Sequence, residues 1–221
     1  MARHSRIVIS NNLHHVTQIG NYQQRVFESD EHFRKYCAWM NEYAEHYGLK
    51  IVAYCLMSNH VHFIVIPPRQ ESLSKVFNTV HMRYAHYINR LRGMKGHLWQ
   101  GRFYSCILDE AHVYRAIRYV ETNPVRAKIV TEAKEYEWSS AREHLGLITQ
   151  GVIKISTENA MINKYKWEHY LREEDFEMKR DIEEKTSRGL VVGNEAFVKM
   201  LEVKLGRSLK CLGQGRPRKY N

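Results

Sequence analysis

Residues 50–66 constrain the fold most tightly, because they predict a β-hairpin that carries two histidines. An apolar run from Ile51 to Leu56 leads to the polar pair Ser58-Asn59, and a β-branched run from His60 to Ile66 follows. Short apolar runs on either side of a two-residue turn are typical of paired antiparallel strands. The chain is therefore expected to build a sheet that includes this hairpin.

The second strand of the hairpin holds His60 and His62, which could share one metal ion. Side chains two positions apart on a strand project from the same face, so Val61 and Phe63 point into packing on the other side. The alternative is that the pair is incidental, because the chain holds 13 histidines. A third ligand and a reacting group nearby are needed to favour a metal site.

The rest of the first two thirds of the chain supplies elements in a recognisable order. Strand character at residues 7–9 and 15–19 precedes a helical period that begins at Asp30, a plausible N-cap, and ends at Gly48. After the hairpin come a helix with an apolar stripe from Leu73 to Leu91, a strand at 104–108, and a helix from about 111 to 122 that Asp109 caps and Asn123-Pro124 stops. This order predicts an α+β fold with a ferredoxin-like βαββαβ core, an antiparallel sheet and helices on one face.

After about Gly146 the sequence becomes mostly polar and charged. We expect residues 1–146 to form one domain and residues 147–221 a polar extension with a short amphipathic helix near 195–205. The extension finishes in a basic tail that includes Arg216 and Arg218 and is too poor in apolar residues to pack by itself. A Gly-Arg-Pro core can insert arginine into a narrow minor groove, and a solvated tail is an equal alternative.

The composition predicts a basic protein of the cytoplasm that binds a polyanionic partner. The 34 Lys and Arg exceed the 24 Asp and Glu, for a formal charge of +10, which favours nucleic acid as partner over a basic protein without such a partner. No apolar run approaches the about 20 residues that span a bilayer, and the start lacks a secretory signal, so no membrane partner is expected. The four cysteines are widely spaced, as expected of reduced thiols in a cytosolic protein.

The helix predicted at 111–122 could supply the third ligand and the reacting group that a metal site at the histidine pair needs. Tyr119 and Asn123 are four residues apart and so lie on one face, where Asn123 could offer an oxygen to a metal and Tyr119 a phenol to its ligand. Two histidines and a carboxamide suit Mg²⁺ or Mn²⁺, which can assist phosphoryl transfer. The alternative is a helix tyrosine with its ring in the core, which 14 tyrosines make common.

Several arginines are candidates for contacts to DNA phosphates. Arg115 and Arg118 lie on the same helix as Tyr119, and Arg126 lies just past it. Arg102 follows Gly101, whose missing side chain allows a backbone to approach closely. Together these residues predict a basic surface around the candidate site.

Three segments together resemble one known family. Asn59-His60-Val61-His62, Leu98-Trp99-Gln100-Gly101-Arg102-Phe103 and Arg118-Tyr119-Val120-Glu121-Thr122-Asn123-Pro124-Val125-Arg126-Ala127 occur in the order and spacing of REP-associated tyrosine transposases, of the single-tyrosine HUH superfamily. His15-Val16-Thr17 and Trp138-Ser139-Ser140-Ala141 also match that pattern. His14 and Ile19 stand where the family usually has tyrosine and arginine, which affects guide recognition and not the chemistry.

The resemblance implies a catalytic core at residues 1–146 that cleaves and joins single-stranded DNA with Mg²⁺ or Mn²⁺. His60 and His62 would be the HUH metal ligands, Asn123 the third ligand, and Tyr119 the nucleophile that forms a 5′-phosphotyrosine. The implied partner is hairpin DNA from repetitive extragenic palindromes, with a guide bound by residues 3–22, and the protein would be a monomer or homodimer. A regulator that binds hairpins without cutting them, or a metal-dependent RNA-processing enzyme, are the alternatives.

Overall fold

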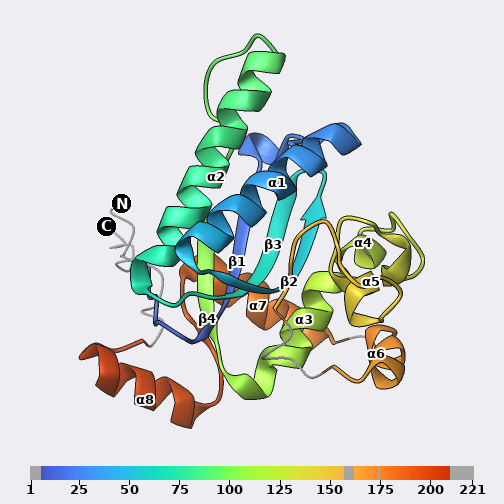
Figure 1. Ribbon diagram of the computed structural model, residues 1–221. Helices are drawn as coiled ribbons and strands as arrows, with labels where there is room; N and C mark the ends of the chain where they lie inside the picture. The colour runs from blue at the N-terminus through green and yellow to red at the C-terminus, as the bar shows by residue number, and fades with distance from the viewer. Residues whose placement is uncertain (1–5, 157–161, 174, 210–221) are drawn as a thin grey trace, which may run out of the picture.

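The first seven elements of the fold follow the predicted order of strands and helices. A computed structural model describes residues 6–156, 162–173 and 175–209 (Figure 1). Its elements begin with β1 (Leu13–Ile19), α1 (Asp30–Tyr47), β2 (Lys50–Met57), β3 (His60–Ile66), α2 (Gln70–Leu91), β4 (Tyr104–Leu108) and α3 (Val113–Glu121). The predicted hairpin is confirmed, with its two strands joined by residues 58–59.

The sheet has the order β2-β3-β1-β4-β5. The first four strands pair antiparallel, with β1 between β3 and β4, which is the expected ferredoxin-like arrangement. The fifth strand, β5 (Val191–Val192), pairs parallel with β4 and comes from the extension. It was not predicted, because two residues are too short to show an alternating pattern.

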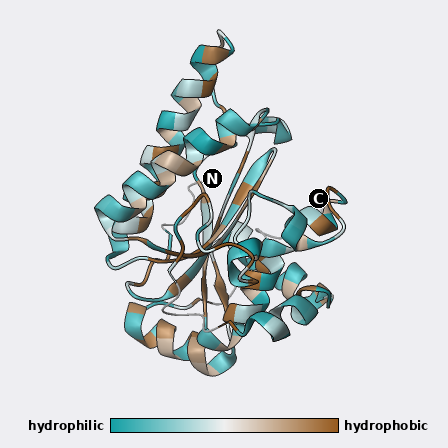
Figure 2. Ribbon diagram, turned by 45° about the vertical axis from the view of Figure 1, so that its right-hand side comes forward, coloured by the Kyte–Doolittle hydropathy of each residue, from teal (hydrophilic) through white to brown (hydrophobic). Residues whose placement is uncertain are grey.

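Helices cover both faces of this sheet. On one face α1 and α2 pack over Val16, Phe63 and their neighbours, as predicted for the two core helices. On the other face α3 packs with α7 (Phe176–Arg188) over a second cluster that includes Ile64 and Cys106. Figure 2 shows that the helices carry both hydrophilic and hydrophobic residues, as helices with one buried side do. The face that carries His60 and His62 is thus enclosed by α3.

The ends of the elements agree with the predictions in some places and differ in others. Ser29 rather than Asp30 caps α1, since its side chain accepts a hydrogen bond from the His32 amide. Residues 7–9 lie outside any strand, although Ile7 and Ile9 are buried. The helix α3 ends at Glu121, just before Asn123-Pro124 as predicted, and a separate short helix, α4 (Asn123–Arg126), begins after Thr122. Proline fits the first turn of α4 because it lacks only an amide that this turn leaves unpaired.

The extension packs onto the core instead of standing apart. After α5 (Ala141–His144) come α6 (Lys164–Leu171), α7 and α8 (Glu195–Leu205), the last with the bounds expected from the sequence. Leu201 of α8 packs with Ile107 of β4, and α7 lies against β4 and α3. The division at residue 146 stays a prediction. No helix within the described ranges has the length and apolar character to cross a membrane.

A buried carboxylate ties α3 to the segments that follow it. Glu121 is fully buried, and its two oxygens accept hydrogen bonds from Ser140 Oγ (2.6 Å), His144 Nδ1 (2.5 Å) and Trp167 Nε1 (2.9 Å). Burial opposes the charge on His144, but the charge and hydrogen bond of Glu121, together with Glu143, raise its pKa overall. The pair thus favours a protonated His144.

We expect His144→Gln to lower the free energy of unfolding by about 1.5–3 kcal/mol in mildly acidic solution, because a charged hydrogen bond is lost. Since the folded pKa of His144 is raised, its contribution is complete below about pH 6.5, the unfolded value, and is lost as pH rises through the folded pKa. Urea unfolding over this pH range should show the two proteins converging as pH rises. A difference that is constant with pH would contradict the ion pair.

Candidate active site

The strand β3 brings the two predicted metal ligands together on the face beneath α3. His60 is half-buried and His62 is 6% exposed, and their ring centroids lie 5.0 Å apart with perpendicular planes. Thr17 of β1 and Cys55 of β2 lie opposite His62 in the sheet. Both neighbours are small, which leaves room above the strand for the rings and for α3.

The helix α3 places Tyr119 against the histidines. The phenol is 6% exposed, and its ring meets His62 edge-on, with centroids 5.6 Å apart. Asn123 follows one turn later, and its Nδ2 donates to the Tyr119 carbonyl oxygen at 3.2 Å and to that of Val120 at 3.4 Å. With the amide nitrogen so engaged, the carboxamide oxygen is the atom that Asn123 can offer to a ligand.

Arg126 of α4 adds a positive charge to this group. Its guanidinium lies 4.4 Å from the centroid of the Tyr119 ring, and its Nη2 donates to the Tyr119 carbonyl oxygen at 2.7 Å. The residue remains solvent-exposed, so a phosphate could reach it. Arg126 thus lies over the candidate nucleophile, and its predicted contact to DNA phosphate stays a prediction.

Burial and charge keep both histidines neutral. The pKa of His60 falls to about 4, first through burial and then through the nearby charge of Arg126. The pKa of His62 falls well below its usual value through burial, with His60, His15 and Arg126 adding to the effect. Neutral imidazoles have a free lone pair, which is the form that binds metal ions.

The phenol of Tyr119 is held in its protonated form by its surroundings. Burial raises its pKa above the usual value of about 10, the Glu183 carboxylate adds to this, and Arg126 opposes it. The phenol donates a hydrogen bond of 3.5 Å to Glu183 Oε1 on α7. A group that accepts the proton and one that favours negative charge therefore flank the hydroxyl.

The donor set fits a divalent cation. His60 Nδ1 lies 2.6 Å from the Asn59 Oδ1 acceptor, so this nitrogen holds the hydrogen and Nε2 has the lone pair. His62 also uses Nδ1 in a hydrogen bond, to His15. No group of three His, Cys, Asp or Glu residues suited to a metal occurs in the described part of the chain, and Asn123, the third ligand predicted from the sequence, is of another type.

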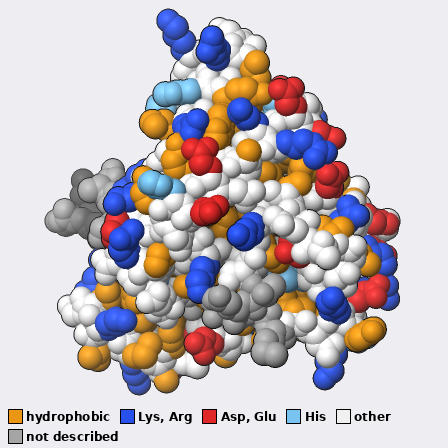
Figure 3. Space-filling model, in the orientation of Figure 1, with side chains coloured by type: hydrophobic (Ala, Val, Ile, Leu, Met, Phe, Trp, Pro, Cys, Tyr) orange, Lys and Arg blue, Asp and Glu red, His pale blue; other side chains and the backbone are white. Residues whose placement is uncertain are grey.

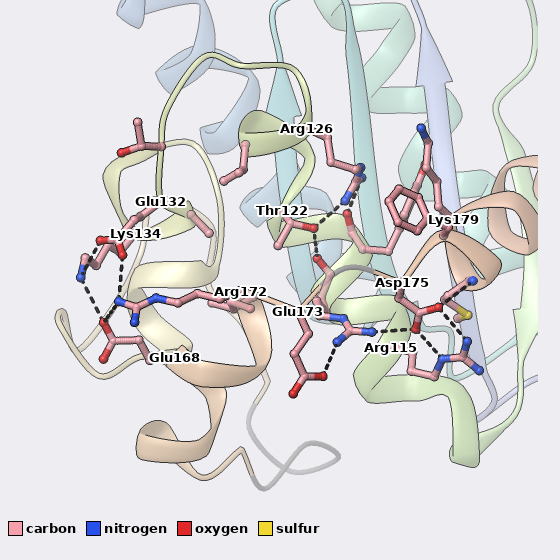
Figure 4. A pocket seen from close by; sticks show the side chains of 18 of the residues that line it. Arg115, Thr122, Arg126, Glu132, Lys134, Glu168, Arg172, Glu173, Asp175 and Lys179 are labelled. Carbon is pink, nitrogen blue, oxygen red and sulfur yellow. Dashed lines mark hydrogen bonds and ion pairs between the residues drawn. The ribbon is translucent and has the colours of Figure 1, made fainter.

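Arg115 and Arg118 of α3 form ion pairs with carboxylates near the start of α7. Arg115 contacts both oxygens of Asp175 at 2.7 and 2.8 Å, and Arg118 contacts Asp175 at 2.6 Å and Glu173 at 3.0 Å. Figure 4 shows Arg115, Glu173 and Asp175 converging at one side of a cavity of about 650 Å³. Carboxylates thus occupy the sites at which phosphate was predicted, and DNA contacts by these two arginines stay a prediction.

The remaining predicted DNA contacts lie elsewhere. Arg102 is exposed beside a separate groove between α2 and the loop before β4, and it does not join the Tyr119 site. Arg216 and Arg218 lie outside the described residues, as do residues 3–5 of the predicted guide-binding segment. His14 is fully buried and its Nδ1 bonds the Asn12 carbonyl oxygen at 2.8 Å, so it supports its own loop.

Sequence reasoning missed three side chains of the site. His15 was noted only as part of a family pattern, although its alternation with Val16 places it on the same face of the sheet as His62. Glu183 and Thr186 of α7 were missed entirely. They lie three residues apart and so share a helix face, but they sit in a segment with few apolar residues to indicate which face is buried.

Comparisons with known proteins bear on the family and the fold of the chain. The family model described as "Transposase IS200 like" matches residues 8–123. A solved structure of a REP-associated tyrosine transposase bound to a REP hairpin matches with a TM-score of 0.57 and 18% identity over 66% of this chain and 86% of that chain. A candidate transposase from Deinococcus radiodurans matches with a TM-score of 0.39 and 18% identity over 55% of this chain and 97% of that chain.

No curated protein sequence matches the chain. The structural match shows the fold, and the family model covers more than half of the sequence, from residue 8, shortly before β1, to the candidate ligand Asn123. The chain therefore belongs to the IS200-like transposase family.

Proposed function

We propose that this protein is a metal-dependent endonuclease and strand-transferase that acts on single-stranded hairpin DNA through a 5′-phosphotyrosine. The observation that carries the proposal is the position of Tyr119, edge-on to the neutral His62 and one helical turn from Asn123. Support for a hairpin partner comes from the solved relative, which is bound to a REP hairpin.

His60, His62 and Asn123 are the residues that would hold Mg²⁺ or Mn²⁺. A hard divalent cation bound there would polarise a phosphodiester and stabilise the departing alkoxide. Histidine ligands shift the preference toward Mn²⁺. The charge of Arg126 close to the histidines is compatible with such a site, because its guanidinium is engaged with Tyr119 and Thr122.

Tyr119 would carry out the covalent step. Its Oη forms a bond to phosphorus, the bond from phosphorus to the 3′ oxygen breaks, and the strand on the 3′ side of the cut stays linked to the protein through its 5′ phosphate. The phenol proton passes to Glu183, and the departing 3′ oxygen takes up a proton from water. Attack of a 3′ hydroxyl on the phosphotyrosine reverses these changes and rejoins DNA.

The basic character of the surface suits a single-stranded DNA partner. Exposed Lys128 and Lys179 line the cavity beside Tyr119, together with Arg126. Figure 3 shows Lys and Arg side chains spread over one face of the molecule, including the end of α2, among fewer acidic ones. Phosphate contacts of this kind hold a strand without reading its sequence.

We expect Tyr119→Phe to abolish covalent attachment to a labelled hairpin oligonucleotide in the presence of Mn²⁺, because phenylalanine has no oxygen to bond phosphorus. The readout is a protein–DNA adduct that survives denaturation. Tyr114→Phe, an exposed tyrosine of the same helix, is the control and should form the adduct normally. An adduct with Tyr119→Phe would refute the nucleophile, and no adduct with the wild type on any palindrome would favour the regulator.

Removal of divalent cations should separate binding from cleavage. We expect a chelator to stop adduct formation while retention of the hairpin in a gel-shift assay persists, because the basic side chains do not depend on the metal. Added Mn²⁺ should restore cleavage in the wild type and much less in Asn123→Ala. Full cleavage in the chelator would contradict the metal role of His60, His62 and Asn123.

We expect Glu183→Gln to slow adduct formation by about 100-fold, within the range that general bases contribute, because the amide cannot accept the phenol proton. Single-turnover rates with saturating hairpin measure this step. Glu184→Gln is the matched control, since Glu184 pairs with Arg188 away from the phenol. Equal rates for the two variants would exclude Glu183 as the proton acceptor.

A further inference from the structure

A line of buried hydrogen bonds connects the candidate metal ligand His62 to the extension. His15 Nε2 lies 2.9 Å from His62 Nδ1, and the two rings stack with centroids 5.1 Å apart and planes at 16°. The other nitrogen of His15, Nδ1, lies 2.8 Å from Thr186 Oγ1 on α7. Exposure of His15 is 1% and that of Thr186 is 2%, so water does not compete for these bonds.

The hydrogen between the two rings can have only one of two placements. A contact of 2.9 Å between two ring nitrogens holds a single hydrogen, so one nitrogen donates and the other accepts. If His62 Nδ1 donates, its Nε2 keeps a lone pair that can bind a metal. If His15 Nε2 donates, the hydrogen of His62 lies on Nε2 and blocks that nitrogen. The orientation of this one bond therefore decides whether His62 can be a ligand.

We propose that His15 and Thr186 are positioning residues that hold His62 as the Nδ1–H tautomer, so that Nε2 faces the metal. In this arrangement His62 Nδ1 donates to His15 Nε2, and His15 Nδ1 donates to the Thr186 hydroxyl oxygen. The hydroxyl hydrogen can then be directed at Cys106 Sγ, 3.0 Å away. Every member of the line then has a partner, as buried polar groups require. The inference rests on the proposed metal-dependent function.

His15 is better suited to this role than to that of a third histidine ligand. Both of its nitrogens are already in hydrogen bonds, one to His62 and one to Thr186. Metal-bound histidines commonly donate their second N–H to an acceptor that fixes the ring, usually a carboxylate or carbonyl. Here a second imidazole supplies that acceptor, and it adds no negative charge beside Tyr119.

The line of hydrogen bonds from His62 through His15 to Thr186 also gives the extension a part in the site. Thr186 lies beyond residues 8–123, the part of the chain that the family model matches. The helix α7 carries both Thr186, which contacts His15, and Glu183, which contacts the candidate nucleophile Tyr119. Displacement of α7 would thus loosen the proposed metal ligand and remove the proton acceptor together.

The test uses the full chain without DNA and measures affinity for Mn²⁺ by electron paramagnetic resonance of the free ion. We expect Thr186→Val and His15→Phe to weaken binding by about 10–100-fold, the usual effect of losing a residue that orients a metal ligand. Thr186→Ser keeps the hydroxyl and should restore wild-type affinity. Tyr114→Phe, an exposed tyrosine of α3 outside the candidate site, should bind Mn²⁺ as the wild type does.

The second readout is the tautomer of His62 without metal, from long-range ¹H–¹⁵N spectra of histidine-labelled protein. We expect the Nδ1–H form in the wild type and in Thr186→Ser, and a mixture in Thr186→Val. An Nε2–H form in the wild type, or wild-type Mn²⁺ affinity in Thr186→Val, would overturn the proposed positioning role of His15 and Thr186. A wild-type chain that binds no Mn²⁺ would overturn the metal-dependent function as well, and adduct formation by that chain would show that only the metal role had failed.

Discussion

The antiparallel pairing of β1 with β3 is the constraint on which the candidate site depends. It sets Thr17 opposite His62 and His15 opposite Ile64, so His15 and His62 become diagonal neighbours on one face. A shift of one residue would turn each of these side chains to the other face. The apolar residues between them, Val16 and Phe63, resist such a shift because they are fully buried under α1 and α2.

The position of α3 over that face depends on buried polar contacts at both of its sides. Glu121 binds three donors from the segments after α3, and Arg118 stacks on Tyr170 at 3.9 Å while pairing with Asp175. Arginine and carboxylate groups so enclosed are costly to separate, because each would be left as a buried charge. These contacts hold Tyr119 at a set distance from His62, which hydrophobic packing alone would define less narrowly.

The sequence predicted the order of the core strands and helices and some of the residues of the candidate site. Alternation and turn residues located the hairpin, and α3 brings Tyr119 against His62, while the place of Asn123 beside the histidines stays a prediction. The partners of Arg115 and Arg118 could not be foreseen, because Asp175 is far away in sequence and lies in a polar stretch without a clear period. For the same reason the strand β5 and the contacts of Thr186 and Glu183 emerge only from tertiary packing.

The charges around Tyr119 also show how the proposed metal site could lie in basic surroundings. Burial and Arg126 keep His60 and His62 neutral, so the site holds no imidazolium that would repel a metal ion. Arg126 itself lies over the Tyr119 ring and bonds its carbonyl oxygen, which directs its charge toward the phenol and an incoming phosphate. A negative phosphodiester between the histidines and Arg126 would then separate a bound cation from the charge of the guanidinium.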